Sequence, residues 1–64
     1  MNNLKKWTTV FFSHDDVSYR GLIVEEHEVF YRVLLRRKLV KGNLIHYRAN
    51  RYFFVRKERI RTLS

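Results

Sequence analysis

Cationic and aromatic side chains are interleaved along the second half of this chain, and their types define the chemistry to consider. Lys and Arg neutralise phosphate groups, and flat aromatic rings stack on unpaired bases. Arginine suits the first role especially, because its planar guanidinium makes bidentate contacts to phosphate. The residues predicted to contact nucleic acid are Arg32, Arg36, Arg37, Lys38, Lys41, Tyr47, Arg48, Arg51, Tyr52, Arg56, Lys57 and Arg59.

The charge is divided unevenly between the two halves of the chain. Residues 1–31 hold three basic and five acidic side chains, a net charge of −2. Residues 32–64 hold eleven basic side chains against Glu58 alone, a net charge of +10, and eight of the eleven are arginine. A solvated, solubilising surface is the alternative reading, but mixed signs would serve solubility as well. The distribution therefore favours an acidic ligand.

Other chemistry finds little support in the sequence. His14, Asp15 and Asp16 could form a metal or acid–base site, but adjacent polar residues of this kind are typical of a turn. Cysteine is absent and the three histidines are scattered, so no metal site or other cofactor is expected. No nucleophile motif or phosphate-binding glycine loop is present, and we expect no enzymatic activity.

Runs of β-branched and aromatic residues, separated by polar clusters, predict the elements that position these side chains. We expect one domain over residues 1–64 with strands near 5–13, 17–25, 28–38, 44–49 and 51–56. A short turn at 57–59 then leads into a last strand at 60–63. The predicted fold is all-β. Its core is expected to include Tyr31, Phe53 and Phe54.

Alternation with a period of two predicts that the basic residues share one face of the sheet. Arg32, Arg36 and Lys38 have the same parity, and Arg48 and Arg56 fall on matching positions of the later strands. His46 would lie on the same face. Neighbouring strands would then align these cations into a continuous positive surface.

A helix over about 25–41 is the competing interpretation, and would make the fold α+β. The segment begins with acidic residues, ends with basic residues and is followed by Gly42, and all three are helix signals. Its apolar positions, however, spread around the whole helical wheel without forming a stripe. The strand is therefore preferred.

The order of these features resembles the SH3-like small β-barrels. The resemblance rests on Val10-Phe11-Phe12, the polar excursion at His14-Asp15-Asp16, the aromatic-x-Gly step in 19–24, and the strand, short helical turn and strand of 54–63. It implies a five-stranded barrel with a 3-10 turn before the last strand. Within this superfold the chain looks most similar to the DNA-binding barrels of retroviral-type integrases, and more loosely to the small basic chromatin proteins of archaea.

The chain departs from both groups in having more arginine than lysine and a longer, more basic hairpin at 34–48. SH3-like barrels also bind peptides and join larger complexes, so the fold alone does not give the function.

We expect a non-catalytic accessory or regulatory factor that binds nucleic acid through the phosphate backbone, with DNA slightly favoured over RNA. About five phosphate contacts would give a salt slope of about −4 to −5 on duplex DNA. An acidic protein partner, a homodimer or an anionic lipid surface are the alternatives. No segment approaches the length of about 18 to 20 apolar residues that spans a bilayer. The expected location is cytoplasmic or nucleoid-associated.

Overall fold

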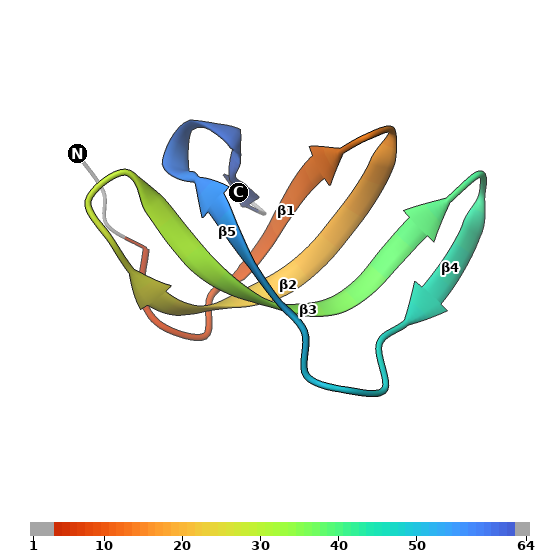
Figure 1. Cartoon of the computed structure of the whole chain (residues 1–64), viewed down its shortest axis with the longest axis horizontal. Helices are drawn as coiled ribbons and strands as arrows, with labels where there is room; N and C mark the ends of the chain where they lie inside the picture. The colour runs from red at the N-terminus through yellow and green to blue at the C-terminus, as the bar shows by residue number, and fades with distance from the viewer. Residues whose placement is uncertain (1–3, 63–64) are drawn as a thin grey trace.

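The computed structural model describes residues 4–62 and consists almost entirely of β-strands (Figure 1). Hairpin turns with positive φ at Asp15, Asp16, Lys41 and Gly42 separate the early strands. The elements are β1 (Thr9–His14), β2 (Val17–Glu26), β3 (Phe30–Val40), β4 (Asn43–His46), β5 (Tyr52–Arg56), the 3-10 turn η1 (Lys57–Arg59) and β6 (Arg61–Thr62).

All six strands belong to one antiparallel sheet with the path β4-β3-β2-β1-β6. The long strand β3 pairs along one edge with β2. Its other edge is shared, because residues 30–34 pair with β5 and residues 37–40 pair with β4. The segment of residues 47–51 crosses from β4 to β5 (Figure 1).

The all-β prediction is confirmed, including the 3-10 turn before the last strand, and the alternative helix over 25–41 is wrong. The six strands correspond to the five predicted strands and the predicted last strand, but the sheet differs from the expected barrel in not being closed. Within residues 4–62 the sheet stays open because β4 and β5 both pair with β3, whereas β6 pairs with β1.

The expected strand boundaries differ from the structure at the two ends of the chain and at β4, which ends at His46 rather than at residue 49. β1 begins at Thr9 rather than at residue 5, because the φ of 72° at Trp7 places a left-handed turn before it. The predicted last strand at 60–63 reduces to two residues, and Leu63 lies outside the described part of the chain.

The core lies on the concave face of the bent sheet. Its buried residues alternate along the strands as the period of two requires, and they are Val10, Phe12, Ile23, Tyr31, Val33, Leu35 and Val55. Phe53 packs against this cluster, so Tyr31 and Phe53 are core residues as expected. The same expectation is wrong for Phe54, which lies between Phe53 and Val55 and must face outward; its exposed fraction is 65%.

Two irregularities in the pairing of β2 with β3 bend the sheet. Arg20 pairs with Arg37 and Gly21 pairs with Leu35, which leaves Arg36 as an extra residue on β3. A second shift lies between Ile23 and Glu25 on β2. Such β-bulges increase the local twist and change the direction of side chains, and both effects matter for the candidate site.

Gly21 allows β2 and β3 to approach closely at the first bulge. A Cβ atom at this position would lie 2.5 Å from the main-chain oxygen of Leu34 and 2.6 Å from Cγ1 of Val33. Both distances are shorter than van der Waals contact, so a larger residue would force the strands apart. The glycine therefore helps to fix the register that brings Arg20 opposite Arg37.

Candidate nucleic-acid interface

A row of side chains crosses five strands on the convex face of the sheet, opposite the core. Arg61 pairs with Phe11, Phe11 with Arg20, Arg20 with Arg37, and Arg37 with His46. Paired residues on adjacent strands point to the same face, with Cβ atoms about 4.5 to 5.5 Å apart. We call these five residues the cross-strand row. It gathers three arginines, a histidine and an aromatic ring.

The bulge on β3 adds a fourth arginine to this face. Arg36 is exposed and lines the same polar hollow as Arg20, Arg37 and His46, with a volume of about 200 Å³. The main-chain oxygen of Arg36 accepts a hydrogen bond from the Tyr47 nitrogen at 2.9 Å, which holds the bulge against the segment after β4. Two consecutive arginines thus serve one surface, although strict alternation would separate them.

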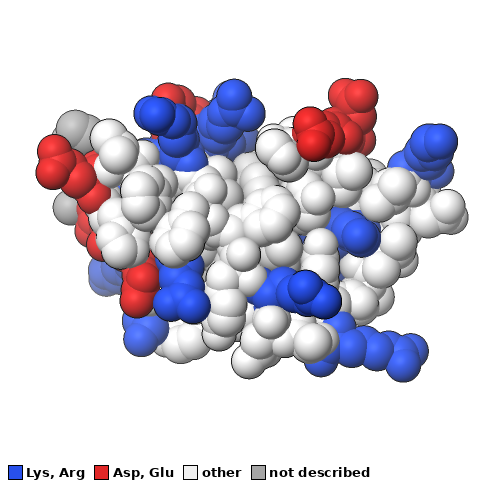
Figure 2. All heavy atoms as spheres, viewed as in Figure 1, with Lys and Arg blue, Asp and Glu red and all other residues white. Residues whose placement is uncertain are grey.

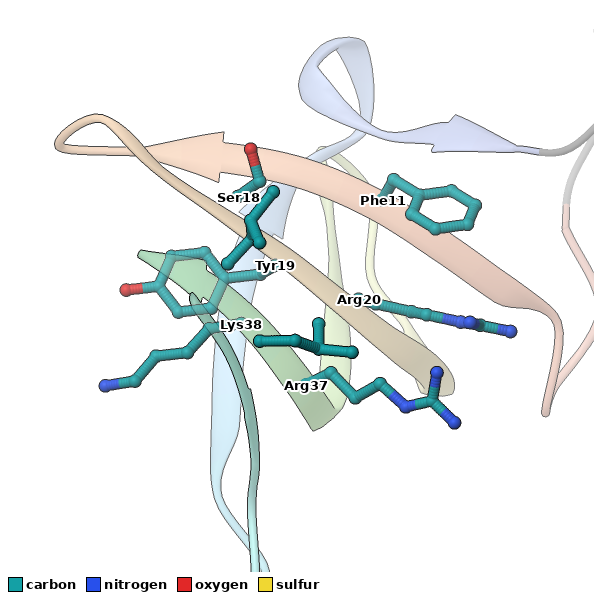
Figure 3. Close-up of a pocket in the computed structure, with 8 residues that line it drawn as sticks. Phe11, Ser18, Tyr19, Arg20, Arg37 and Lys38 are labelled. Carbon is teal, nitrogen blue, oxygen red and sulfur yellow. The ribbon is translucent and has the colours of Figure 1, made fainter. Parts of the chain in front are cut away.

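An apolar groove of about 280 Å³ flanks the row on its other side. Phe11, Leu39 and Leu44 supply its apolar wall, and Arg20 and Arg37 supply its charged margin. In Figure 3 the side chains of Phe11, Arg20 and Arg37 extend to one side of the sheet, whereas Tyr19 and Lys38 extend to the other. The guanidinium carbon of Arg20 lies 5.7 Å from the centre of the Phe11 ring.

The acidic side chains neutralise other cations rather than those of the row. Arg32 lies 3.6 Å from Glu25, Arg56 lies 3.9 Å from Glu58, and Lys57 Nζ lies 2.7 Å from Glu26 Oε2. Within residues 4–62, no carboxylate lies within ion-pair distance of Arg20, Arg36, Arg37 or Arg61. The arginines of the row and Arg36 therefore carry positive charge that no ion pair among the described residues compensates.

On the face viewed in Figure 2, the cations do not form one uninterrupted patch. Figure 2 shows an uncharged centre on the viewed face with separate groups of Lys and Arg around it, and with acidic side chains among them at the left end and along the top. Of the four arginines of the shared-face prediction, three lie on one face of the sheet. By register Arg32 and Arg56 lie on the convex face along with Arg36, whereas Arg48 lies in the segment between β4 and β5.

Arg32 and Tyr52 form a second group on the convex face. The Arg32 guanidinium lies 4.2 Å from the centre of the Tyr52 ring, an arrangement typical of a cation–π contact. Arg32 pairs in register with Phe54, and Arg56 pairs with Phe30. Arginine and aromatic side chains therefore alternate across β3 and β5.

Lys38 departs most clearly from the predicted face. Because Arg36 is an extra residue, Lys38 pairs with Tyr19 on the concave side, and its Nζ lies 5.6 Å from the Tyr47 ring centre. The shared-face expectation is wrong for this residue.

Partial burial raises the pKa of Tyr47 above its usual 10.0; the nearby Tyr19 adds to this effect, and Arg51 opposes it.

The remaining predicted site residues lie in turns and around the edge of the sheet. Lys41 is in the β3–β4 turn, and Arg48 and Arg51 are exposed between β4 and β5. Lys57 and Arg59 belong to η1, and Lys57 Nζ also lies 5.1 Å from the Tyr31 ring centre. These positions do not continue the cross-strand row, and their contact with nucleic acid stays a prediction.

Four members of the row were not among the predicted site residues: Phe11, Arg20, His46 and Arg61. Of these, only His46 was expected on the same face as the predicted cations. Arg20 lies in the acidic half of the chain, so the division of charge pointed away from it. The signal that could have found it is Gly21, because a glycine inside a strand pattern indicates a bulge and hence a change of parity.

The described residues contain no group of three or more His, Cys, Asp or Glu side chains arranged to hold a metal ion. Nor does this part of the chain contain a helix that is long and apolar enough to cross a membrane. Comparisons with protein-family models, curated proteins and solved structures gave no match.

Proposed function

We propose that this chain is a small, non-catalytic nucleic-acid-binding domain that contacts mainly the phosphate backbone through the cross-strand row and Arg36. The observation that carries the proposal is the direct pairing of Arg20 with Arg37 in the absence of a neighbouring carboxylate among the described residues. Like charges directly opposite each other destabilise a sheet. A phosphate bound between the two guanidinium groups would attract both of them and so offset their mutual repulsion.

The row supplies the elements that backbone recognition requires. Arg61, Arg20 and Arg37 succeed one another across neighbouring strands, with Phe11 between the first two. Strands lie about 4.8 Å apart, so successive guanidinium groups can follow a phosphate backbone across the sheet. Arginine also offers bidentate hydrogen bonds to phosphate oxygens.

The apolar groove beside the row would receive the parts of the ligand that carry no charge. Phe11, Leu39 and Leu44 offer surface to a sugar or to an unpaired base, and aromatic stacking of a base contributes about 1 to 3 kcal/mol. This surface tolerates any base, which agrees with recognition of the backbone more than of sequence. DNA remains slightly favoured over RNA as the ligand.

A domain of this kind would act as an accessory or regulatory factor in the cytoplasm or on the nucleoid. Its net charge of +8 would draw it to nucleic acid by long-range attraction. Catalysis has no part in the proposal.

Titration of fluorescently labelled duplex and single-stranded oligonucleotides, followed by anisotropy, tests the proposal. We expect a Kd between about 10⁻⁴ and 10⁻⁶ M that weakens steeply as salt is added. Absence of binding tighter than about 100 µM at about 50 mM salt would contradict it. Tighter binding to an acidic protein or to anionic vesicles than to either oligonucleotide would contradict it as well.

A further inference from the structure

The strand β5 carries an exposed aromatic surface that the proposed nucleic-acid interface does not use. Phe54 is exposed to 65% and Tyr52 to 42%, although both are large apolar side chains in a regular strand. The Phe54 ring contacts Phe30 edge-on, with ring centres 5.2 Å apart, and it lies close to His27. Exposed aromatic clusters of this kind are typical of protein–protein interfaces.

The main chain of β5 is also unpaired along one edge. Within the described residues β5 pairs only with β3 (Figure 1). The Leu35 nitrogen donates to the Arg51 oxygen at 2.8 Å, and the Lys57 nitrogen donates to the Val29 oxygen at 3.0 Å. In an antiparallel ladder these groups alternate, so the N–H and C=O groups of Tyr52, Phe54 and Arg56 point away from β3.

Space for another strand exists along this edge. A hollow of about 610 Å³ lies between β5 and the end of β1, and all five residues of β5 line it, from both faces of the strand. The remaining lining residues include Phe12, His14 and Arg59. An open edge with outward-pointing main-chain groups is a template for pairing with another strand.

We infer that β5 pairs with β5 of a second copy of this chain in antiparallel orientation, with the two Phe54 residues directly opposite each other. The outward main-chain groups of Phe54 fit this arrangement, because the central pair of such a two-fold ladder exchanges both of its hydrogen bonds. The same register places Tyr52 opposite Arg56 of the second copy, and Phe53 opposite its Val55. The sequence of β5 is thus complementary to itself.

Charge complementarity supports a second copy as the partner. Cations and carboxylates alternate around β5, in the pairs Arg32–Glu25, Arg56–Glu58 and Lys57–Glu26. Two copies of a mixed surface can meet without a local repulsion at the β5 edge, so only the long-range repulsion between two chains of net charge +8 opposes the association. The pairing of Tyr52 with Arg56 would also repeat, between the two chains, the contact that Arg32 already makes with the Tyr52 ring at 4.2 Å.

The other long exposed edge is a poorer candidate. Leu44 and Ile45 on β4 are exposed to 55% and 43%, but β4 lies beside Arg37 and Arg36, to which the described residues offer no carboxylate within ion-pair distance. Two copies that met along β4 would bring these uncompensated cations together. The dimer through β5 instead continues the sheet, so that both cross-strand rows face the same side.

The test uses the full chain and its natural lack of cysteine. In the inferred dimer the Cα atoms of the two residues 54 lie about 5.5 Å apart, which is within the range that a disulfide spans. Under mild oxidation F54C should form a covalent dimer. The matched control L44C, at a position on β4 where Leu44 is also more than half exposed, should remain monomeric.

Sedimentation of the chain without cysteine gives an independent readout. The average mass should rise from 8.0 kDa toward twice this value as concentration increases. Added salt should strengthen the association, because it screens the repulsion between two chains of like net charge. F54K should abolish the rise in mass and L44K should not, with melting curves showing that both variants fold.

A monomeric F54C, equal cross-linking of F54C and L44C, or a rise in mass that survives F54K would each overturn the inference. A strand of a different protein would then be left as the occupant of the β5 edge. Because salt weakens nucleic-acid binding and strengthens this dimer, the two proposals can fail separately.

Discussion

Arg20 on β2 and Arg37 on β3 lie directly opposite each other on the convex face of the sheet, and in the described part of the chain no carboxylate lies within ion-pair distance of either side chain. A carboxylate or a neutral residue at one of the two positions would make the folded sheet more stable. The pair costs folding free energy in the unbound protein, and an anionic ligand would recover it.

The first prediction is that R37Q stabilises the free protein while it weakens binding of nucleic acid. Removal of one charge relieves the cross-strand repulsion, worth roughly 0.2 to 1 kcal/mol at low salt. Urea unfolding at low and at high salt measures this effect, which should shrink at high salt because of screening. A variant that is less stable than the natural chain at low salt would contradict the idea of unrelieved repulsion.

The second prediction concerns Gly21, which fixes the register of the row. G21A should lower the free energy of unfolding by about 1 to 3 kcal/mol, because its Cβ would meet the Leu34 oxygen and Val33. The matched control is G42A, which meets no atom within 4 Å. It should cost about 1 to 2 kcal/mol through its positive φ alone and should leave binding unchanged.

Urea unfolding together with the oligonucleotide titration separates these two glycines. If G21A keeps both the stability and the affinity of the natural chain, the close approach of β2 and β3 does not determine the surface.

The third prediction uses the raised pKa of Tyr47. Burial is the main cause, and it disfavours the charged form in the folded state. Above about pH 10 the unfolded chain loses this proton before the folded chain does, so stability should fall as pH rises. Y47F should remove this part of the fall. Urea unfolding between about pH 9 and pH 11 measures it, and identical pH profiles for the two proteins would exclude the assignment to Tyr47.

The fourth prediction asks whether Arg32 takes part in binding. Glu25 lies 3.6 Å from Arg32, so E25Q should free the guanidinium and strengthen binding about two- to five-fold, the equivalent of about 0.5 to 1 kcal/mol. D16N in the β1–β2 turn removes the same charge far from Arg32 in the sequence and should have a smaller effect. Equal effects of the two variants on the Kd would mean that only the net charge matters.

The period of two in the sequence was sufficient to predict most of the fold. Val33 and Leu35 face the core as their alternation requires, and the 3-10 turn before the last strand lies where the polar residues 57–59 placed it. The open sheet was not predictable in this way, because the pairing of β4 and β5 with the same edge of β3 depends on contacts between residues distant in sequence.

The candidate site was predicted less completely, for a specific physical reason. One extra residue on β3, Arg36, reverses the parity of every later residue in that strand. Arg37 therefore joins the convex face and Lys38 leaves it. Arg20 was missed because the net charge of each half of the chain does not show which residues the pairing of β2 with β3 brings together.

The reversal at Arg36 also provides the most direct test of the account. R36Q/R37Q and K38Q/K41Q each lower the net charge from +8 to +6, but only the first pair lines the polar hollow that also contains Arg20 and His46. The decisive measurement is the dependence of the dissociation constant on salt, by oligonucleotide anisotropy, for these two variants and the natural chain. Melting curves confirm that each variant is folded.

We predict that R36Q/R37Q weakens binding at least tenfold at low salt, about 1.4 kcal/mol, and makes the salt slope shallower by about 2. K38Q/K41Q should keep a slope close to that of the natural chain. Equal losses of affinity and slope in the two variants would contradict the central claim, because binding would then follow the net charge rather than the row of arginines that the sheet assembles.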